Sequence, residues 1–322
     1  MKTAIIGLGN IGRVHAKVLS LIGAEIVALS DIEIGRAERI RDEFAPKARV
    51  YDDYKVMLER ETVDVVHVCT PHDMHAEMVV YLLKKGINTL CEKPLCISER
   101  ELDAIFAAEA ESSAILGVCQ QNRYNPSTVF VKKYLEDKKV LGAHGSVVWH
   151  RDEKYYRDSP WRASKSRAGG GALINQALHT LDLCQMLAGE PQKVVARAEN
   201  LAHKGVSEVE DTLTAVFSEG ADITFFTTIA AAVDMPIEVT LKLDGGDVAT
   251  LTPHAVLVNG KTVFEEERRD FHGKVCYGLS HETLISDFYD CIENDREFPI
   301  TAREAAKVLR LIYAAYKSAE EG

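Results

Sequence analysis

Residues 2–12 read Lys-Thr-Ala-Ile-Ile-Gly-Leu-Gly-Asn-Ile-Gly, and this stretch decides the fold. An apolar strand pattern ends at Gly7, and Gly9 and Gly12 complete a Gly-x-Gly-x-x-Gly spacing where a helical pattern begins. In such a strand–turn–helix the first glycine permits the tight turn, the second lets the backbone approach a pyrophosphate, and the third allows close helix–strand packing. The stretch therefore predicts a loop that binds a dinucleotide.

The first 120 residues alternate between strand and helix patterns. Apolar strands are expected at 2–8, 25–31, 64–69, 87–91 and 114–119, with the first helix at 11–22. Near-continuous apolar strands separated by helices are typical of a parallel sheet that is covered on both faces. We expect residues 1–120 to form an α/β Rossmann domain with a parallel, doubly wound sheet.

Residues 121–322 follow a different pattern. Strands are expected at 145–150, 193–200, 211–217, 223–229, 238–243 and 248–251, and helices at 172–187, 282–293 and 302–320. The two-residue alternation and the turn signals predict an α+β domain with an open, mostly antiparallel sheet. One face of such a sheet packs on helices, and the other face is left open. We expect this domain to bind the substrate and to form a homodimer or homotetramer through the open face.

The composition excludes several classes of protein. The chain has 38 basic and 49 acidic residues, a net charge of −11, which disfavours binding to a nucleic-acid backbone. No stretch is long and apolar enough for a membrane span, and the N-terminus shows no signal-peptide pattern. The seven cysteines are odd in number and form no Cys-x-x-Cys pair, so we expect reduced thiols in a cytoplasmic protein.

Asp31, at the end of the second expected strand, indicates which dinucleotide binds. An acid at this place accepts hydrogen bonds from the adenosine ribose hydroxyls and repels a 2′-phosphate. NAD is therefore the expected cofactor, while Arg36 and Arg39 nearby keep NADP open as the alternative.

Glu92-Lys93-Pro94 directly follows the strand expected at 87–91. The ordinary interpretation is a charged strand end with a turn proline. At the carboxyl edge of a parallel sheet, however, ligands of such folds bind. A lysine at this edge can stabilise alkoxide character on an alcohol oxygen as a hydride leaves the neighbouring carbon.

The helix expected at 172–187 carries a polar stripe. Asn175, His179 and Asp182 lie at i, i+4 and i+7, which places them on one helix face. Three glycines at 169–171 precede the helix and let other backbone come close. A lone helical histidine is more often structural, but the polar neighbours on its face favour a proton-transfer role.

The loop at 151–167 is basic and aromatic. It holds three acidic side chains against six basic ones: Arg151, Lys154, Arg157, Arg162, Lys165 and Arg167. Tyr155, Tyr156 and Trp161 are interleaved with them. Two interpretations stay open: a solvated charged loop, or a site for an anionic sugar or for the cofactor pyrophosphate.

In order along the chain, the glycine motif, Thr70-Pro71 with His75, Glu92-Lys93-Pro94 and the helix with His179 and Asp182 resemble the Gfo/Idh/MocA family. This is the family of glucose–fructose oxidoreductase and inositol dehydrogenase, and the resemblance covers essentially the whole chain. It implies an NAD-dependent dehydrogenase or reductase that acts on the hydroxyl or carbonyl carbon of a sugar, sugar derivative or polyol.

By this resemblance Lys93 and His179 are the catalytic pair. The expected cofactor set is Gly7, Gly9, Asn10, Ile11, Gly12, Asp31, Thr70, Pro71, His75, Glu92, Lys93, Trp161 and Arg162. The expected substrate set is Lys93, Arg123, Tyr156, Trp161, Asn175 and His179. No metal is expected, because no acid or cysteine lies at matching spacing to His72 and His75; we interpret His72 as loop surface.

One position departs from the family pattern. Inositol-dehydrogenase-like members carry Asp where this chain has Asn175, and an amide cannot take up a proton. A Lys–Asp–His relay is therefore not available in that form, and His179 is the main acid/base candidate. The Asn175-Gln176 variant resembles the branch that acts on nucleotide-linked and modified sugars.

Two other functions compete with the dehydrogenase. One is a ligand-sensing regulator that binds NAD without turnover, against which the presence of both Lys93 and His179 argues. The other is a reductase of a linear-tetrapyrrole or amino-acid-pathway substrate, which would have no use for the His179 helix. Turnover of a sugar distinguishes the first alternative from an enzyme.

Overall fold

The computed structural model describes residues 1–267 and 280–322. Their contacts divide them into two compact units, and each unit is described by itself. The first contains Met1–Gln121 and residues 280–305, and the second contains residues 122–267 and 306–322. One helix from the C-terminal part of the sequence, α10 (Ser280–Glu293), thus belongs to the first unit.

The first unit is built on a six-stranded parallel sheet with the order β3-β2-β1-β4-β5-β6. Its strands are β1 (Lys2–Ile6), β2 (Glu25–Ser30), β3 (Arg49–Tyr51), β4 (Val65–Val68), β5 (Asn88–Glu92) and β6 (Leu116–Cys119). The connecting helices are α1 (Asn10–Leu21), α2 (Ile34–Phe44), α3 (Tyr54–Arg60), α4 (His72–Lys84) and α5 (Glu99–Ala110). The predicted parallel, doubly wound sheet is confirmed.

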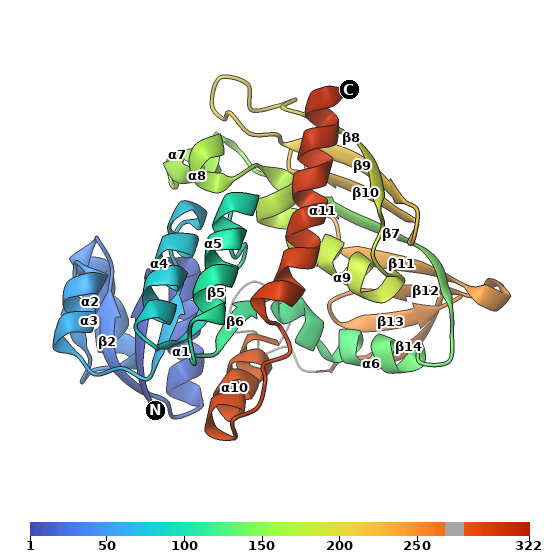
Figure 1. The fold of residues 1–322 in the computed structure, drawn as a ribbon. Helices are drawn as coiled ribbons and strands as arrows, with labels where there is room; N and C mark the ends of the chain where they lie inside the picture. The colour runs from blue at the N-terminus through green and yellow to red at the C-terminus, as the bar shows by residue number, and fades with distance from the viewer. Residues whose placement is uncertain (268–279) are drawn as a thin grey trace. The chain divides into compact units, whose positions relative to one another are not determined.

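The central strands of this sheet bury both of their faces. All four residues of β4 and of β6 are buried, which explains why these strands read as continuous runs instead of alternating ones. Helices α4 and α5 lie side by side, and α10 packs against α1 (Figure 1). The sheet order reverses between β1 and β4, so the loops after these strands open at the switch point where ligands of such sheets bind.

The second unit contains an eight-stranded sheet with the order β14-β13-β12-β11-β7-β10-β9-β8. Its strands are β7 (Val140–Val148), β8 (Lys193–Glu199), β9 (Thr212–Ser218), β10 (Ile223–Thr228), β11 (Glu238–Leu243), β12 (Val248–Leu251), β13 (Ala255–Val258) and β14 (Lys261–Glu265). All neighbours pair antiparallel except β7 and β10, which are parallel. The predicted mostly antiparallel sheet is confirmed.

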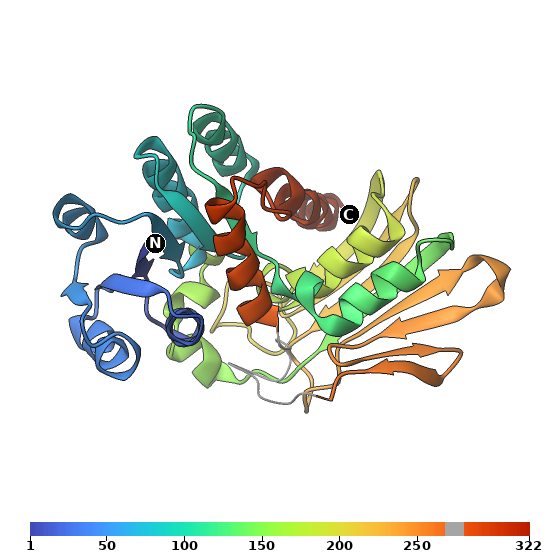
Figure 2. The same cartoon turned by 90° about the horizontal axis from the view of Figure 1, so that it is seen from below.

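Helices cover one face of the second sheet. Figure 2 shows α6 (Pro126–Tyr134) and α9 (Leu178–Ala188) lying along the same face, where α9 contacts β7, β10 and β11 and α6 contacts β12 to β14. Short helices α7 (Glu153–Arg157) and α8 (Lys165–Ala168) interrupt the loop at 151–167. The long C-terminal helix α11 (Ala302–Glu321) joins this unit from residue 306 onward.

Several elements differ from the sequence-based expectations. Strands β3, β13 and β14 were not predicted, since each is only 3 to 5 residues long and β14 is largely exposed. The strand expected at 145–150 begins already at Val140. His72 is not loop surface, because it begins α4 and is only 4% exposed. Among the described helices, none is both long and apolar enough to cross a membrane.

Candidate functional site

The glycine motif forms a turn with an open cradle. Gly7 adopts a φ of +85°, which favours glycine, and a Cβ on Gly12 would lie 2.0 Å from the Gly7 carbonyl oxygen. A Cβ on Gly9 would meet nothing within 4 Å, and Gly9, the N-cap residue of α1, makes no side-chain cap bond to the first amides of the helix. Amides at a helix N-terminus beside open space fit a pyrophosphate, so the residues present fit a dinucleotide.

Asp31 organises the loops around this cradle. Its carboxylate accepts hydrogen bonds from the backbone N–H groups of Leu8 at 2.7 Å and Glu33 at 2.9 Å. Arg36 Nη1 lies 3.2 Å from the same carboxylate, which is buried. The carboxylate is thus in place at the end of β2, and Arg36, one of the two arginines that kept NADP open, is already paired with it.

His75 ties together the loops that follow β4 and β5. Its ring nitrogens lie 2.8 Å from the carbonyl oxygen of Thr70 and 2.7 Å from that of Pro94. Burial lowers the pKa of His75, although the two carbonyl contacts act in the opposite direction. This expected cofactor residue therefore holds the backbone of the Thr70-Pro71 turn at a fixed distance from the Glu92-Lys93-Pro94 segment.

Lys93 follows β5 at the carboxyl edge of the sheet, as predicted, and is half-buried. The neighbouring Glu92 is buried and uses both carboxylate oxygens: Oε2 accepts the Lys93 backbone N–H at 3.1 Å, and Oε1 lies 3.0 Å from His15 Nε2. Burial acts to raise the pKa of Glu92, but the hydrogen bond to His15 and its charge outweigh burial and lower it to about 2.

His15, Glu92 and His281 have ligand atoms within 4.8 Å of one another, the one such group among the described residues. The shortest of these contacts is the hydrogen bond between His15 and Glu92. We therefore interpret the group as hydrogen-bonded and keep the absence of a metal as a prediction.

In the second unit, the helix that carries His179 begins with a π-helical turn, Leu173–Ala177. The half-buried Glu210 carboxylate accepts the N–H groups of Gly171 at 2.7 Å and Leu173 at 3.0 Å, and the Tyr316 hydroxyl at 2.9 Å. A Cβ on Gly171 would lie 1.8 Å from the Glu210 carbonyl oxygen. The glycine run does let other backbone come close, and π-turns of this kind are frequent at functional sites.

The three residues of the predicted polar stripe on this helix differ in burial and in local structure. Asp182 is 1% exposed and forms a two-pronged ion pair with Arg123, at 2.6 and 2.7 Å. His179 is 8% exposed, whereas Asn175 lies in the π-turn and is half-buried. Asp182 thus orients Arg123, an expected substrate residue, and His179 stays the candidate for proton transfer.

The basic loop at 151–167 finds many of its counter-charges within the same unit. Ion pairs join Arg151 to Asp234, Lys154 to Asp158, Arg157 to Glu153 and Lys165 to Glu320. Arg162 lies over the rings of Tyr155 and Trp161, 4.6 and 5.3 Å from their centroids. The charge excess that the sequence showed is therefore largely balanced in the structure.

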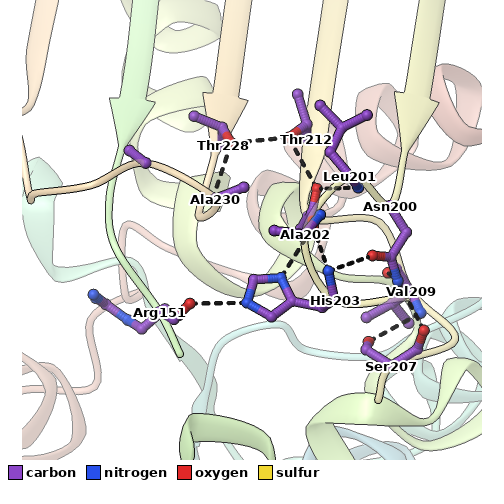
Figure 3. Close-up of polar contacts among 12 residues, drawn as sticks. Arg151, Asn200, Leu201, Ala202, His203, Ser207, Val209, Thr212, Thr228 and Ala230 are labelled. Atoms are coloured by element: carbon purple, nitrogen blue, oxygen red, sulfur yellow. Dashed lines mark hydrogen bonds and ion pairs between the residues drawn. The ribbon is translucent and has the colours of Figure 1, made fainter. Parts of the chain in front are cut away.

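A buried pair anchors the start of this loop (Figure 3). His203 Nδ1 lies 3.0 Å from the Asp211 carboxylate, and its Nε2 lies 2.8 Å from the Arg151 carbonyl oxygen. Asp211 also accepts the backbone N–H groups of Leu201 and Ala202, which lower its pKa against the opposing effect of burial. Tyr156, an expected substrate residue, is 3% exposed and packs edge-on against His203.

Sequence reasoning missed the residues that support the candidates. His15, Glu210 and His203 each hold a loop or a carboxylate in place, but none stands in a motif that reveals a partner 77, 39 or 52 residues away. One signal was present: a histidine three residues after Gly12 points from α1 toward the neighbouring strands.

The fold and the cradle define a class: an oxidoreductase with a Rossmann nucleotide-binding unit and a second α+β unit. Two family models match the chain, the NAD-binding Rossmann fold of the oxidoreductase family at residues 1–120 and the GFO/IDH/MocA C-terminal domain at residues 132–273. The chain belongs to the Gfo/Idh/MocA family, and it is an NAD-dependent oxidoreductase.

Curated relatives match over nearly their full length. The scyllo-inositol 2-dehydrogenase (NAD(+)) of Bacillus subtilis is 26% identical over 336 residues, covering 100% of this chain and 95% of the relative. The inositol 2-dehydrogenase of Rhizobium meliloti is 25% identical over 331 residues, covering 100% and 97%.

Solved structures share the fold. The WlbA dehydrogenase of Bordetella pertussis, in complex with NADH and UDP-GlcNAcA, has a TM-score of 0.85 at 24% identity and covers 100% of this chain and 97% of that one. Levoglucosan dehydrogenase with NADH and levoglucosan has the same TM-score at 20% identity and the same coverage. At these identities the likeness shows the fold alone.

Proposed function

We propose that the chain oxidises a CH–OH group of a sugar, sugar derivative or polyol with NAD, or reduces the corresponding carbonyl. The observation that carries the proposal lies at the carboxyl edge of the first sheet. There the open turn at Gly9 follows β1 and Lys93 follows β5, so a cofactor cradle and a cationic hydrogen-bond donor share one edge. The inositol dehydrogenases among the relatives support the substrate class.

The proposed roles follow from the chemistry of the two side chains. When bound, NAD supplies the hydride acceptor. Lys93 donates a hydrogen bond to the substrate oxygen and stabilises its developing negative charge, and His179 takes the hydroxyl proton. Glu210 fixes the π-turn that precedes His179, and Asp182 fixes Arg123 for a substrate hydroxyl or acid group.

The test is turnover by the purified full-length chain with NAD and a panel of hexoses, polyols, uronates and nucleotide-linked sugars. NADH should accumulate with at least one member, or be consumed with the matching ketone. A chain that binds NAD tightly but turns over no member in either direction would instead support the ligand-sensing regulator.

The finer proposal is an anionic or nucleotide-linked substrate. Asn175 in place of an acid removes one negative charge from the substrate side, and Arg162 lies between two aromatic rings. Because ion pairs already neutralise basic side chains of the loop at 151–167, the loop supports this proposal less strongly than the composition of the loop suggested. A hexose should be turned over with lower kcat/KM than its uronate, and the gap should narrow with salt; a neutral sugar that is always preferred would contradict it.

We also propose that a second copy covers the open face of the eight-stranded sheet. Val195 on β8 and Val216 on β9 are cross-strand partners on this face, and they are 75% and 50% exposed. Lys193 and Arg197 flank this apolar pair on the same face of β8, and a homodimer or homotetramer would bury the pair. Light scattering should show an oligomer that the double substitution Val195→Lys and Val216→Lys dissociates; a monomeric wild type would contradict the proposal.

We also propose that the protein is located in the cytoplasm. The supporting observation is that the six cysteines in the described part of the chain form no disulfide bond with one another.

A further inference from the structure

A chain of buried polar side chains runs through the first unit from Glu92. Its other members are His15 on α1, His67 on β4, Tyr289 on α10 and Thr3 on β1, and each is at most 8% exposed. Buried polar groups cost free energy unless they are hydrogen-bonded, so five of them in line call for an explanation. Of the five, only Glu92 belongs to the residues expected at the cofactor, and the proposed function gives none of the others a role.

Hydrogen bonds connect all five residues. Glu92 Oε1 lies 3.0 Å from His15 Nε2, and His15 Nδ1 lies 2.7 Å from His67 Nδ1. His67 Nε2 lies 3.1 Å from the Tyr289 hydroxyl, which in turn lies 2.7 Å from Thr3 Oγ1. Both nitrogens of both rings thus have partners, and neither ring can turn without breaking two hydrogen bonds.

The far side of the Glu92 carboxylate contacts the backbone of Lys93. Oε2 accepts the Lys93 N–H at 3.1 Å, so one carboxylate bridges the imidazole of His15 and the backbone of the proposed catalytic lysine. An ionised Glu92 accepts hydrogen bonds at both oxygens, whereas protonation at Oε1 would turn that oxygen into a donor and reverse its hydrogen bond with His15.

His15 is the main group that keeps Glu92 ionised. Burial acts to raise the pKa of Glu92, and the largest opposing influences come from His15, followed by His281 and Lys93, so the pKa is about 2. Burial and the nearby His15 keep the pKa of His67 well below its usual value, which makes His67 a neutral partner.

His281 and Lys93 act on the pKa of Glu92 in the same direction as His15, but more weakly. Three thiols interact electrostatically with Glu92: Cys69, Cys91 and Cys119. Burial raises the pKa of each of them well above its usual value. They are neutral at physiological pH. His281 Nε2 lies 3.9 Å from Glu92 Oε1, beyond hydrogen-bond distance.

We propose that His15 is a positioning residue, which holds the Glu92 carboxylate against the backbone of Lys93 and so sets the lysine for the reaction. His67, Tyr289 and Thr3 hold the ring of His15 in turn. The inference rests on the proposed role of Lys93, but it concerns the protonation of Glu92, which is measurable without substrate.

The deciding measurement is infrared absorption of protonated carboxyl groups in the substrate-free, full-length protein as pH is varied. In His15→Asn the largest influence that opposes the burial of Glu92 is lost and those of His281 and Lys93 remain, so one carboxyl group should become protonated at a higher pH than in the wild type. The double variant His15→Asn, Glu92→Gln should lack it, which assigns the signal. The matched control His144→Asn replaces an exposed histidine of the second sheet and should match the wild type.

Tyr289→Phe removes a single hydroxyl at the distal end and keeps the fold testable if His15→Asn fails to fold. In this variant the infrared absorption of protonated Glu92 should also increase, but by less than in His15→Asn. Unchanged carboxyl spectra in both variants would overturn the proposal, and His15 would then have only a packing role. A stoichiometric transition metal in the purified protein, lost in His15→Asn, would overturn it as well.

Kinetics provide the second readout, once a substrate is identified. When the pH is lowered from about 8 to about 6, the factor by which kcat falls should be about tenfold larger in His15→Asn than in the wild type. The KM for NAD should change little. An equal loss at both pH values would indicate a merely structural role. Absence of any turnover in the wild type would count against the proposed function and leave the infrared result intact.

Discussion

At the scale of the residue, Gly9 and Gly12 should respond differently to the same methyl group. Gly9→Ala adds a Cβ in open space at an ordinary backbone φ of −68°, so the fold should persist while NAD affinity falls about tenfold or more. Gly12→Ala places its Cβ 2.0 Å from a backbone oxygen, so thermal unfolding should show a loss of roughly 3 kcal/mol or more. Equal melting temperatures for the two variants would contradict the packing role of Gly12.

Lys93 and His179 carry the proposed chemistry, and we expect the cofactor phosphates to bind elsewhere, at the glycine turn. Lys93→Ala and His179→Ala should each reduce kcat on the order of 10² to 10⁴-fold, the usual loss for a removed proton-transfer or charge-stabilising group. Calorimetry should find NAD affinity nearly unchanged, as for the exposed control Lys84→Ala. Near-normal turnover in either variant would remove that residue from the mechanism.

At the scale of the element, acid should weaken the β4–β5 region. Glu92 has a pKa of about 2 in place of 4.5, so its contribution is full above pH 4.5 and is lost as pH falls toward 2, about 3 kcal/mol in all. His67, whose pKa is lowered, is neutral in the fold, so its contribution is lost as pH falls below its usual value. Urea unfolding at stepped pH should show both losses.

Glu92→Gln supplies the control for this acid effect. A side chain that does not titrate should flatten the pH dependence between about pH 4.5 and pH 2, although the variant is less stable at neutral pH. An unchanged slope in the variant would mean that other carboxyl groups cause the acid loss.

Elements with strong local patterns were predictable, and those defined by distant partners were not. The strands at β1, β4 and β11 are continuous or alternating in their apolar residues, so their type is evident. The π-turn before His179 was expected as ordinary helix, because its geometry depends on Glu210, which binds the amides of Gly171 and Leu173 from 37 to 39 residues away. No local propensity encodes such a contact.

At the scale of the whole molecule, ordered motifs predicted the family and the cofactor, whereas a count of the charges in a loop does not show how those charges pair. The loop at 151–167 showed three excess positive charges, yet Arg151 and Lys165 pair with Asp234 and Glu320, acids more than 80 residues distant. The candidate residues themselves were visible because glycine turns and strand ends are fixed by local backbone geometry.

The measurement that tests the central claim most directly follows the hydride. Substrate deuterated at the carbon that bears the reacting hydroxyl is incubated with the enzyme and NAD, and the reduced cofactor is analysed by mass spectrometry. The account predicts that the deuterium is recovered in NADH, because the chain transfers hydride between that carbon and the nicotinamide. Unlabelled NADH, or bound NAD that is never reduced by any sugar-like compound, would contradict it.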